Sequence, residues 1–70
     1  MDFIFVESSN ILGVYYNINT AILYLQFKDG SVYEYYDVPE YVYNEFIAAE
    51  SKGTYAHKNI YKNYKQQKIA

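Results

Sequence analysis

The chain contains no cysteine, no tryptophan and no arginine, and it has a single proline and three glycines among its 70 residues. Without cysteine it can form neither a disulfide nor a thiolate metal site. Its one histidine, His57, cannot complete a zinc site unless carboxylates supply the remaining ligands. We therefore expect no metal and no cofactor, and a chain of this length predicts one domain over residues 1–70.

Long apolar runs are also missing. No stretch approaches the roughly 18 to 20 apolar residues that a membrane helix needs. The first residues, Met1 to Phe5, lack the basic segment and the cleavage site of a signal peptide. The sequence thus predicts no membrane contact and a cytoplasmic location, with which the lack of cysteine agrees.

Tyrosine is abundant, with eleven tyrosines and four phenylalanines. A domain of this size buries only about 60% of the surface that its unfolded chain exposes. With no disulfide or metal, an aromatic core and self-association remain as sources of stability. Because tyrosine suits half-buried positions and interfaces, we expect a homo-oligomer.

Charge is divided unevenly along the chain. Residues 1–50 hold all eight acidic residues and one lysine, whereas residues 51–70 hold five lysines and no acidic residue. A division of this kind is typical of a basic interaction surface. The simpler interpretation, which we favour, is a basic end that only balances the acidic remainder, within one subunit or across a dimer.

Alternation of apolar and polar residues predicts β-strands in the first half. Ile22 to Lys28 places Leu23, Leu25 and Phe27 on one face. Asp29-Gly30 predicts a type I′ hairpin turn, and Val32 to Tyr36 is the returning strand. Ile11 to Tyr16 is a further strand, and residues 3–6 are a candidate fourth. The prediction is an α+β fold with an antiparallel meander of three to four strands.

The second half changes to helical periodicity. Asp37 is the predicted N-cap, with Glu40 completing a capping box, of an amphipathic helix from Val38 to Glu50 that covers the sheet. Gly53 is the predicted left-handed terminator of this helix. A short basic helix from about Thr54 to Gln66 follows, and the last four residues are expected to fray.

Many short motifs of the chain follow one family pattern in order. They are Ser8-Ser9 with Ile11; Leu23, Leu25, Phe27 and Gly30; Tyr33-x-Tyr35; Val38-Pro39; Val42-Tyr43; Ala49-x-Ser51-x-Gly53-x-Tyr55; and Ile60 with Tyr64. In these positions the chain resembles the KTSC domain, a bacterial and phage family also found at the C-terminus of some lysyl-tRNA synthetases. The resemblance implies a domain of unassigned function for which RNA binding has been suggested. The chain departs from the family pattern in two ways. It has Ala56-His57 where the family has an aromatic residue and an asparagine, and it lacks arginine, in which many relatives are richer.

Tyr33 and Tyr35 lie on one face of a predicted strand. Exposed, they would form a platform on which single-stranded bases stack. The simpler interpretation, which we favour, places them in the core under the helix or at a subunit contact.

The lysines of the C-terminal end alternate with tyrosines. Lys58, Lys62 and Lys65 follow a helical spacing, and Lys52, Tyr55, Tyr61 and Tyr64 lie among them. His57 with Lys58 would favour a phosphate at a helix start, although a surface histidine is the plainer interpretation. A basic surface with aromatic side chains pairs phosphates and stacks bases. The isoelectric point near 5.1 opposes this reading.

Catalytic chemistry is not indicated. Ser8-Ser9 has no nucleophile-elbow context, and no acid, base and nucleophile converge in the sequence. We therefore expect no enzyme but a small binding module for RNA or another phosphate-bearing ligand. The alternatives are a phage-type inhibitor that docks on a host protein or sequesters a nucleotide-like signal, and a structural oligomer subunit.

Overall fold

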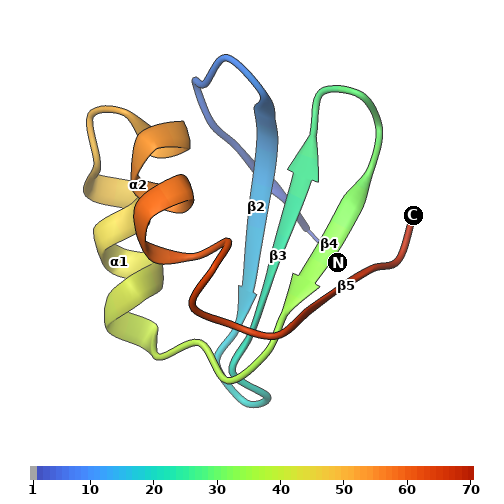
Figure 1. Cartoon of the computed structure of the whole chain (residues 1–70), viewed down its shortest axis with the longest axis vertical. Coiled ribbons are helices and arrows are strands. Elements are labelled where there is room, and N and C mark those ends of the chain that lie inside the picture. The colour runs from blue at the N-terminus through green and yellow to red at the C-terminus, as the bar shows by residue number, and fades with distance from the viewer. Residues whose placement is uncertain (1) are drawn as a thin grey trace.

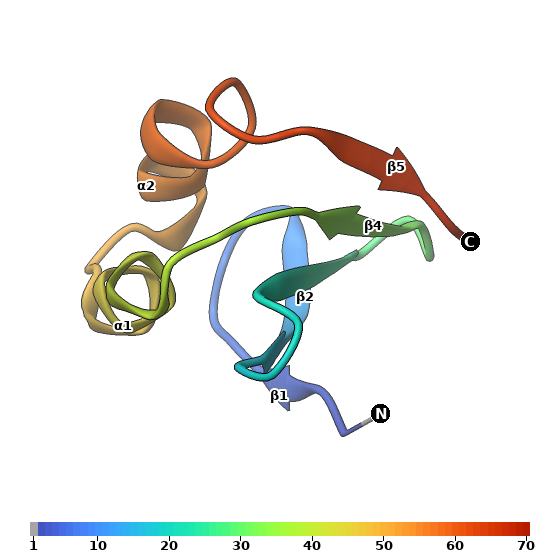
Figure 2. The same ribbon diagram turned by 90° about the horizontal axis from the view of Figure 1, so that it is seen from below.

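Five antiparallel strands form one sheet in the order β1-β2-β3-β4-β5, and both helices lie on the same side of it (Figures 1 and 2). This computed structural model describes residues 2–70. The strands are β1 (Ile4–Phe5), β2 (Ile11–Asn17), β3 (Ile22–Phe27), β4 (Val32–Tyr35) and β5 (Gln66–Lys68). The helices α1 (Glu40–Ala48) and α2 (Lys52–Asn59) come between β4 and β5. The predicted α+β class is confirmed, with five strands where three to four were predicted.

The core fills the space between the sheet and the helices. The strands contribute alternate residues, such as Leu23 and Leu25, and α1 contributes Phe46; all three are fully buried. The remaining buried apolar residues are Ile11, Val14, Tyr35, Val38, Val42, Ala56 and Ile60. The core face predicted from the alternation in Ile22 to Lys28 is thus confirmed.

The hairpin between β3 and β4 lies where Asp29-Gly30 predicted it, but its turn type differs. Gly30 has a φ of +93°, whereas Asp29 does not have positive φ, as a type I′ turn would require. The Gly30 amide donates to the Phe27 carbonyl at 2.9 Å, and the Phe27 amide donates to the Ser31 carbonyl at 2.8 Å. The loop is therefore a three-residue turn closed by a left-handed glycine.

The first helix begins later than predicted, and the proposed Asp37 cap is wrong. Asp37 has a left-handed φ of 57°, and Pro39 occupies the N-cap position without a side-chain hydrogen bond. The intervening Val38 is tied to the sheet: its amide donates to the Ala21 carbonyl at 2.9 Å, and its carbonyl accepts from the Tyr16 hydroxyl at 2.6 Å. The helix can start only after this anchored residue.

The second helix also differs from the prediction. Gly53 does not end a helix; it lies in the first turn of α2, which Ser51 caps by accepting from the Thr54 amide at 3.3 Å. The helix ends at Asn59, before buried Ile60, and not near Gln66.

The residues after α2 return to the sheet instead of fraying. The Tyr36 amide donates to the Lys65 carbonyl at 2.9 Å, and β5 then pairs with β4. Main-chain hydrogen bonds to the free edge of β4 therefore make this segment a β-strand, although its own side chains are polar. No helix within residues 2–70 is long and apolar enough to cross a bilayer.

The other face of the sheet, which we call the open face, carries no helix (Figure 2). Aromatic rings cross it: Tyr15 lies 6.3 Å from Phe3 and 5.7 Å from Tyr24, measured between ring centroids. The Tyr36 hydroxyl donates to Glu34 at 2.9 Å on the same face. These side chains are half-buried by one another, as suits rings with polar tips.

Candidate functional site

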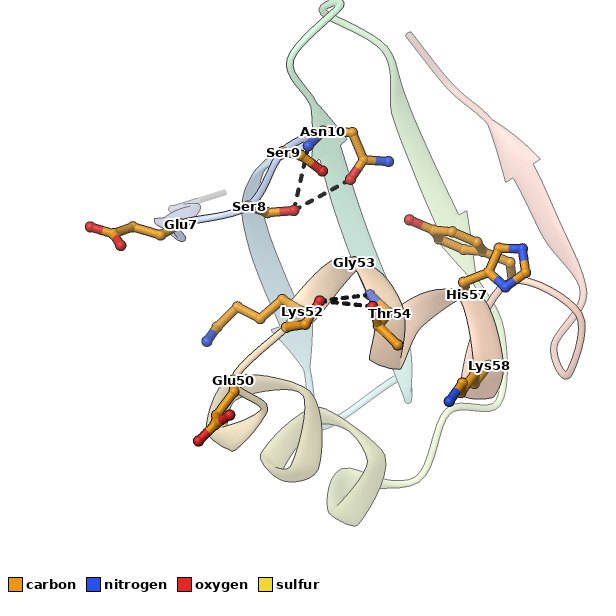
Figure 3. Close-up of a pocket in the computed structure, with 12 residues that line it drawn as sticks. Glu7, Ser8, Ser9, Asn10, Glu50, Lys52, Gly53, Thr54, His57 and Lys58 are labelled. Atoms are coloured by element: carbon orange, nitrogen blue, oxygen red, sulfur yellow. Dashed lines mark hydrogen bonds between the residues drawn. The ribbon is translucent and has the colours of Figure 1, made fainter.

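A polar groove of about 660 Å³ lies between the β1–β2 loop and the first turns of α2 (Figure 3). We call it the first groove. Its lining residues are Glu7, Ser8, Ser9, Asn10, Glu50, Ser51, Lys52, Gly53, Thr54, His57, Lys58 and Tyr61. Two segments at least 40 residues apart in the sequence thus form one surface.

The loop wall of the first groove is held by its own side chains. The Ser8 hydroxyl accepts from the amides of Asn10 and Ile11, both at 3.4 Å, and donates to Asn10 Oδ1 at 3.3 Å. These are the turn-forming hydrogen bonds expected of serine. They fix the direction of the Asn10 side chain beside the helix.

The helix wall approaches the loop at Gly53. A Cβ added there would lie 3.3 Å from Asn10 Oδ1 and 3.5 Å from the Ser8 hydroxyl. Beside it, the Ser51 hydroxyl donates to Thr54 Oγ1 at 2.8 Å. The narrow part of the groove is therefore lined by hydroxyl and amide groups, and its two walls approach closely at Gly53.

Charges are separated along the first groove. Figure 3 shows Glu7 and Glu50 on one side, near Lys52, and His57 with Lys58 on the other. Lys52 Nζ already donates to the Ala49 carbonyl at 3.0 Å. Lys52 lies on the side of the two glutamates, so the other side of the groove carries His57 and Lys58, both exposed.

A second, shallower groove of about 310 Å³ adjoins the first. Its lining residues are Asn10, Phe27, Asp29, Ser31, Tyr33, Tyr35, Tyr61 and Gln66. Aromatic rings form much of it: Tyr33 and Tyr35 are stacked at 6.4 Å and 28°, and Tyr35 and Tyr61 at 6.2 Å and 27°. Burial, and then the neighbouring Tyr61 and Tyr33 hydroxyls, raise the pKa of Tyr35.

The rim of the second groove carries a negative charge. The Asp29 carboxylate accepts from the Ser31 hydroxyl at 2.7 Å and from the Ser31 amide at 2.9 Å. These two hydrogen bonds, the side-chain one foremost, lower the pKa of Asp29 below its usual range. The carboxylate is therefore ionised at neutral pH.

Tyr61 and Asn10 line both grooves and form the wall between them. The Tyr61 hydroxyl is buried and has no hydrogen-bond partner among residues 2–70. Burial raises the pKa of Tyr61, and the nearby Asn10 side chain opposes this rise. This hydroxyl is therefore a buried polar atom at the junction of the two grooves, and Asn10 is the polar side chain that acts on it.

The structure brings together only some of the residues predicted from the sequence. Lys52, His57 and Lys58 line the first groove, and Tyr33 and Tyr35 line the second. Tyr35 is 2% exposed, so the favoured core interpretation is confirmed for it and an open stacking platform of both rings is not formed.

The other predicted residues lie elsewhere. Tyr55 and Tyr64 pack against the core, and the Tyr55 hydroxyl donates to Glu45 at 2.7 Å. Burial, followed by this contact with Glu45, raises the pKa of Tyr55. Lys62 and Lys65 are exposed, lie beyond α2 and line neither groove. The predicted helical stripe of three lysines is therefore wrong, because α2 ends too early to hold it.

The loop wall of the first groove was not predicted from the sequence. Asn10 and the pair Gly53-Thr54 were not among the predicted ligand-binding residues, and nothing in their local sequence places them next to each other. The signal that was available was the ordered Ser8-Ser9 and Ser51-x-Gly53 motifs, which belong to the two walls. As for metals, residues 2–70 contain no group of three or more His, Cys, Asp or Glu side chains that could hold an ion.

Comparisons with known proteins agree on one family. The sequence model of the KTSC domain matches residues 7–64. A KTSC domain protein from Yersinia pestis has a crystal structure that superposes with a TM-score of 0.92 at 33% identity, covering 99% of this chain and 97% of that one.

Two curated relatives show where such sequences occur. A lysine–tRNA ligase from Nostoc is 41% identical over 64 residues, which is 91% of this chain but 11% of the ligase. A protein from Tsukamurella paurometabola is 44% identical over 50 residues, 71% of this chain and 75% of that protein. The chain therefore spans only a small part of the ligase.

Proposed function

The chain belongs to the KTSC domain family, and from this premise we propose that it is a non-catalytic binding module for single-stranded RNA, held by its phosphates in the first groove. One observation carries the proposal: His57 and Lys58 lie on one side of a polar groove whose walls supply serine and threonine hydroxyls. Cationic and hydroxyl side chains are the groups that contact phosphate oxygens. The 41% identity to part of a lysine–tRNA ligase supports an RNA ligand.

Equilibrium titration of a short fluorescent single-stranded RNA tests this proposal. Affinity should fall steeply as salt rises, with a slope of about 0.7 in log–log form for each phosphate contact. Lys58→Ala should weaken binding and reduce the slope by about that amount. Lys62→Ala is the matched control, since it removes the same charge from an exposed lysine outside both grooves. Absence of binding at low salt, or equal losses in the two variants, would contradict the proposal.

The open face of the sheet favours a second candidate, a contact with another protein. Phe5 is 74% exposed there, and its neighbours Phe3 and Tyr15 continue the aromatic surface. We propose a second copy of this chain as the first partner to test. Sedimentation should show mass above the 8.3 kDa monomer at high concentration, and Phe5→Ser should return it to the monomer. A monomer at every concentration would rule this contact out.

A further inference from the structure

The second groove has no part in phosphate binding as proposed above. We propose that it is the subsite for the base of the nucleotide whose phosphate occupies the first groove. This inference rests on the proposed function and names the ligand unit: one nucleotide, either within a single strand of RNA or free. Three independent observations support it. They are the stacked rings of the second groove, the wall that both grooves share, and the negative charge at the rim of the second groove.

The aromatic rings of the second groove are arranged as a stack. Tyr33, Tyr35 and Tyr61 follow one another at 6.4 and 6.2 Å with interplanar angles of 28° and 27°. Phe27 stands at 89° to Tyr33 and closes the group from the side. Tyr33 is half-buried, so part of its side chain remains accessible in the groove. A planar base can extend such a stack, because every base has a π-face.

The two grooves are continuous at Tyr61. On the side of the first groove, the His57 ring lies 6.3 Å from the Tyr61 ring; on the side of the second, Tyr35 lies 6.2 Å from it. The buried Tyr61 hydroxyl, unpartnered within residues 2–70, and the Asn10 side chain are at this junction. Because this hydroxyl is buried, a ligand that spans both grooves would bring polar atoms, such as those of a ribose, next to it only if the Tyr61 or Asn10 side chain shifts.

The charges fix which end of a nucleotide lies in which groove. Lys58 and His57, on the side of the first groove away from Glu7 and Glu50, favour phosphate there, whereas the Asp29 carboxylate, whose charge nearby Lys68 partly offsets, disfavours it in the second groove. A carboxylate accepts hydrogen bonds from an exocyclic amino group, as of cytosine N4, and disfavours a carbonyl oxygen in the same place. Gln66 adds an amide to the rim. The second groove should therefore prefer cytosine to uracil.

Amide chemical shifts of the full chain, followed during titration, test the inference with three small probes. Cytidine monophosphate should move amides of both grooves, and ribose 5-phosphate should move only those near residues 8–10 and 52–58. The cytidine nucleotide should bind about tenfold more tightly than ribose 5-phosphate, the gain expected of one stacked base. Uridine monophosphate should bind between the two.

Two variants separate the base from the phosphate. Tyr33→Leu should abolish the advantage of cytidine monophosphate over ribose 5-phosphate and leave ribose 5-phosphate binding unchanged. Asp29→Asn changes only an exposed turn residue and should abolish the preference for cytidine over uridine, so the inference remains testable if Tyr33→Leu does not fold. Binding of a cytidine trinucleotide much tighter than that of the monophosphate would indicate RNA as the source, and equal binding a free nucleotide.

The contrary outcomes are distinct. If ribose 5-phosphate binds as tightly as cytidine monophosphate and amides of the second groove stay still, the base subsite is wrong while the proposed function stands. If neither the small probes nor RNA move amides of the first groove, the proposed function fails, and the base subsite with it.

Discussion

The two faces of the sheet use the same strands in different ways. On the helix-covered face, Leu23 and Leu25 are fully buried against α1 and α2. On the open face, the residue between them, Tyr24, is half-buried and lies 5.7 Å from the ring of Tyr15. Burial of apolar area stabilises the first face, whereas ring contacts and hydrogen-bonded hydroxyls keep the second compatible with water.

This difference shows how a 70-residue chain uses its tyrosines. The helices cover only one face of the sheet. The other face contacts water although many of its side chains are aromatic. Rings with polar tips suit such a face, as in the Tyr36 hydroxyl that bonds both Glu34 and Gln67. Substitutions on the two faces should therefore have unequal effects on stability.

The largest effect is expected in the core that α1 forms against the covered face of the sheet. Phe46 is fully buried, and Phe46→Ala should lower the free energy of unfolding by about 3–5 kcal/mol, because it leaves a cavity as well as losing buried area. Denaturant unfolding followed by circular dichroism measures this. Ile47→Ala is the control on the same helix, 37% exposed, with an expected change of about 0.5 kcal/mol or less. Similar losses in the two variants would refute the assigned helix face.

A smaller effect is expected on the open face. Tyr24→Ala removes a ring that contacts Tyr15 but leaves the core untouched, so the free energy of unfolding should fall by about 0.5–1.5 kcal/mol. The same denaturant experiment applies. A loss as large as that of Phe46→Ala would mean that the open face is as tightly packed as the core, and the contrast between the faces would disappear.

The smallest effect is expected at the junction of the grooves. Tyr61→Phe removes only a buried hydroxyl that has no partner within residues 2–70. Deleting an unsatisfied polar group should leave the free energy of unfolding unchanged or raise it by about 1 kcal/mol. A loss of more than about 1 kcal/mol would show instead that this hydroxyl is paired, with Asn10 as its nearest candidate.

The sheet could be predicted where the local sequence carries the physical cause. Alternation placed Leu23, Leu25 and Phe27 on the covered face, and Gly30 supplied the positive φ of the β3–β4 turn. Strand β5 could not be predicted, because Gln66–Lys68 is polar and its pairing depends on the free edge of β4. The start of α1 likewise depends on the anchoring of Val38 to Ala21 and Tyr16, which no local pattern encodes.

The candidate site was predictable only on its helix wall. His57, Lys58 and Lys52 were named from charge and helix position, and they line the first groove. The opposite wall comes from a loop that tertiary folding alone brings to α2, so the family motif Ser8-Ser9 was the signal for it in the sequence. The predicted helical stripe of lysines is absent, because it required a helix that continues past Asn59.

The central claim is that the first groove, whose two walls come closest at Gly53, binds RNA. Gly53→Ala places a methyl group 3.3 Å from Asn10 Oδ1, so the loop wall of the first groove must shift to accept it, whereas the helix preference for alanine over glycine, about 1 kcal/mol, acts on stability in the opposite direction. The test is to measure both RNA affinity and denaturant unfolding on this one variant. We expect a loss of binding of about tenfold or more in a variant that still unfolds in one cooperative transition. Unchanged binding by a folded Gly53→Ala protein would contradict it.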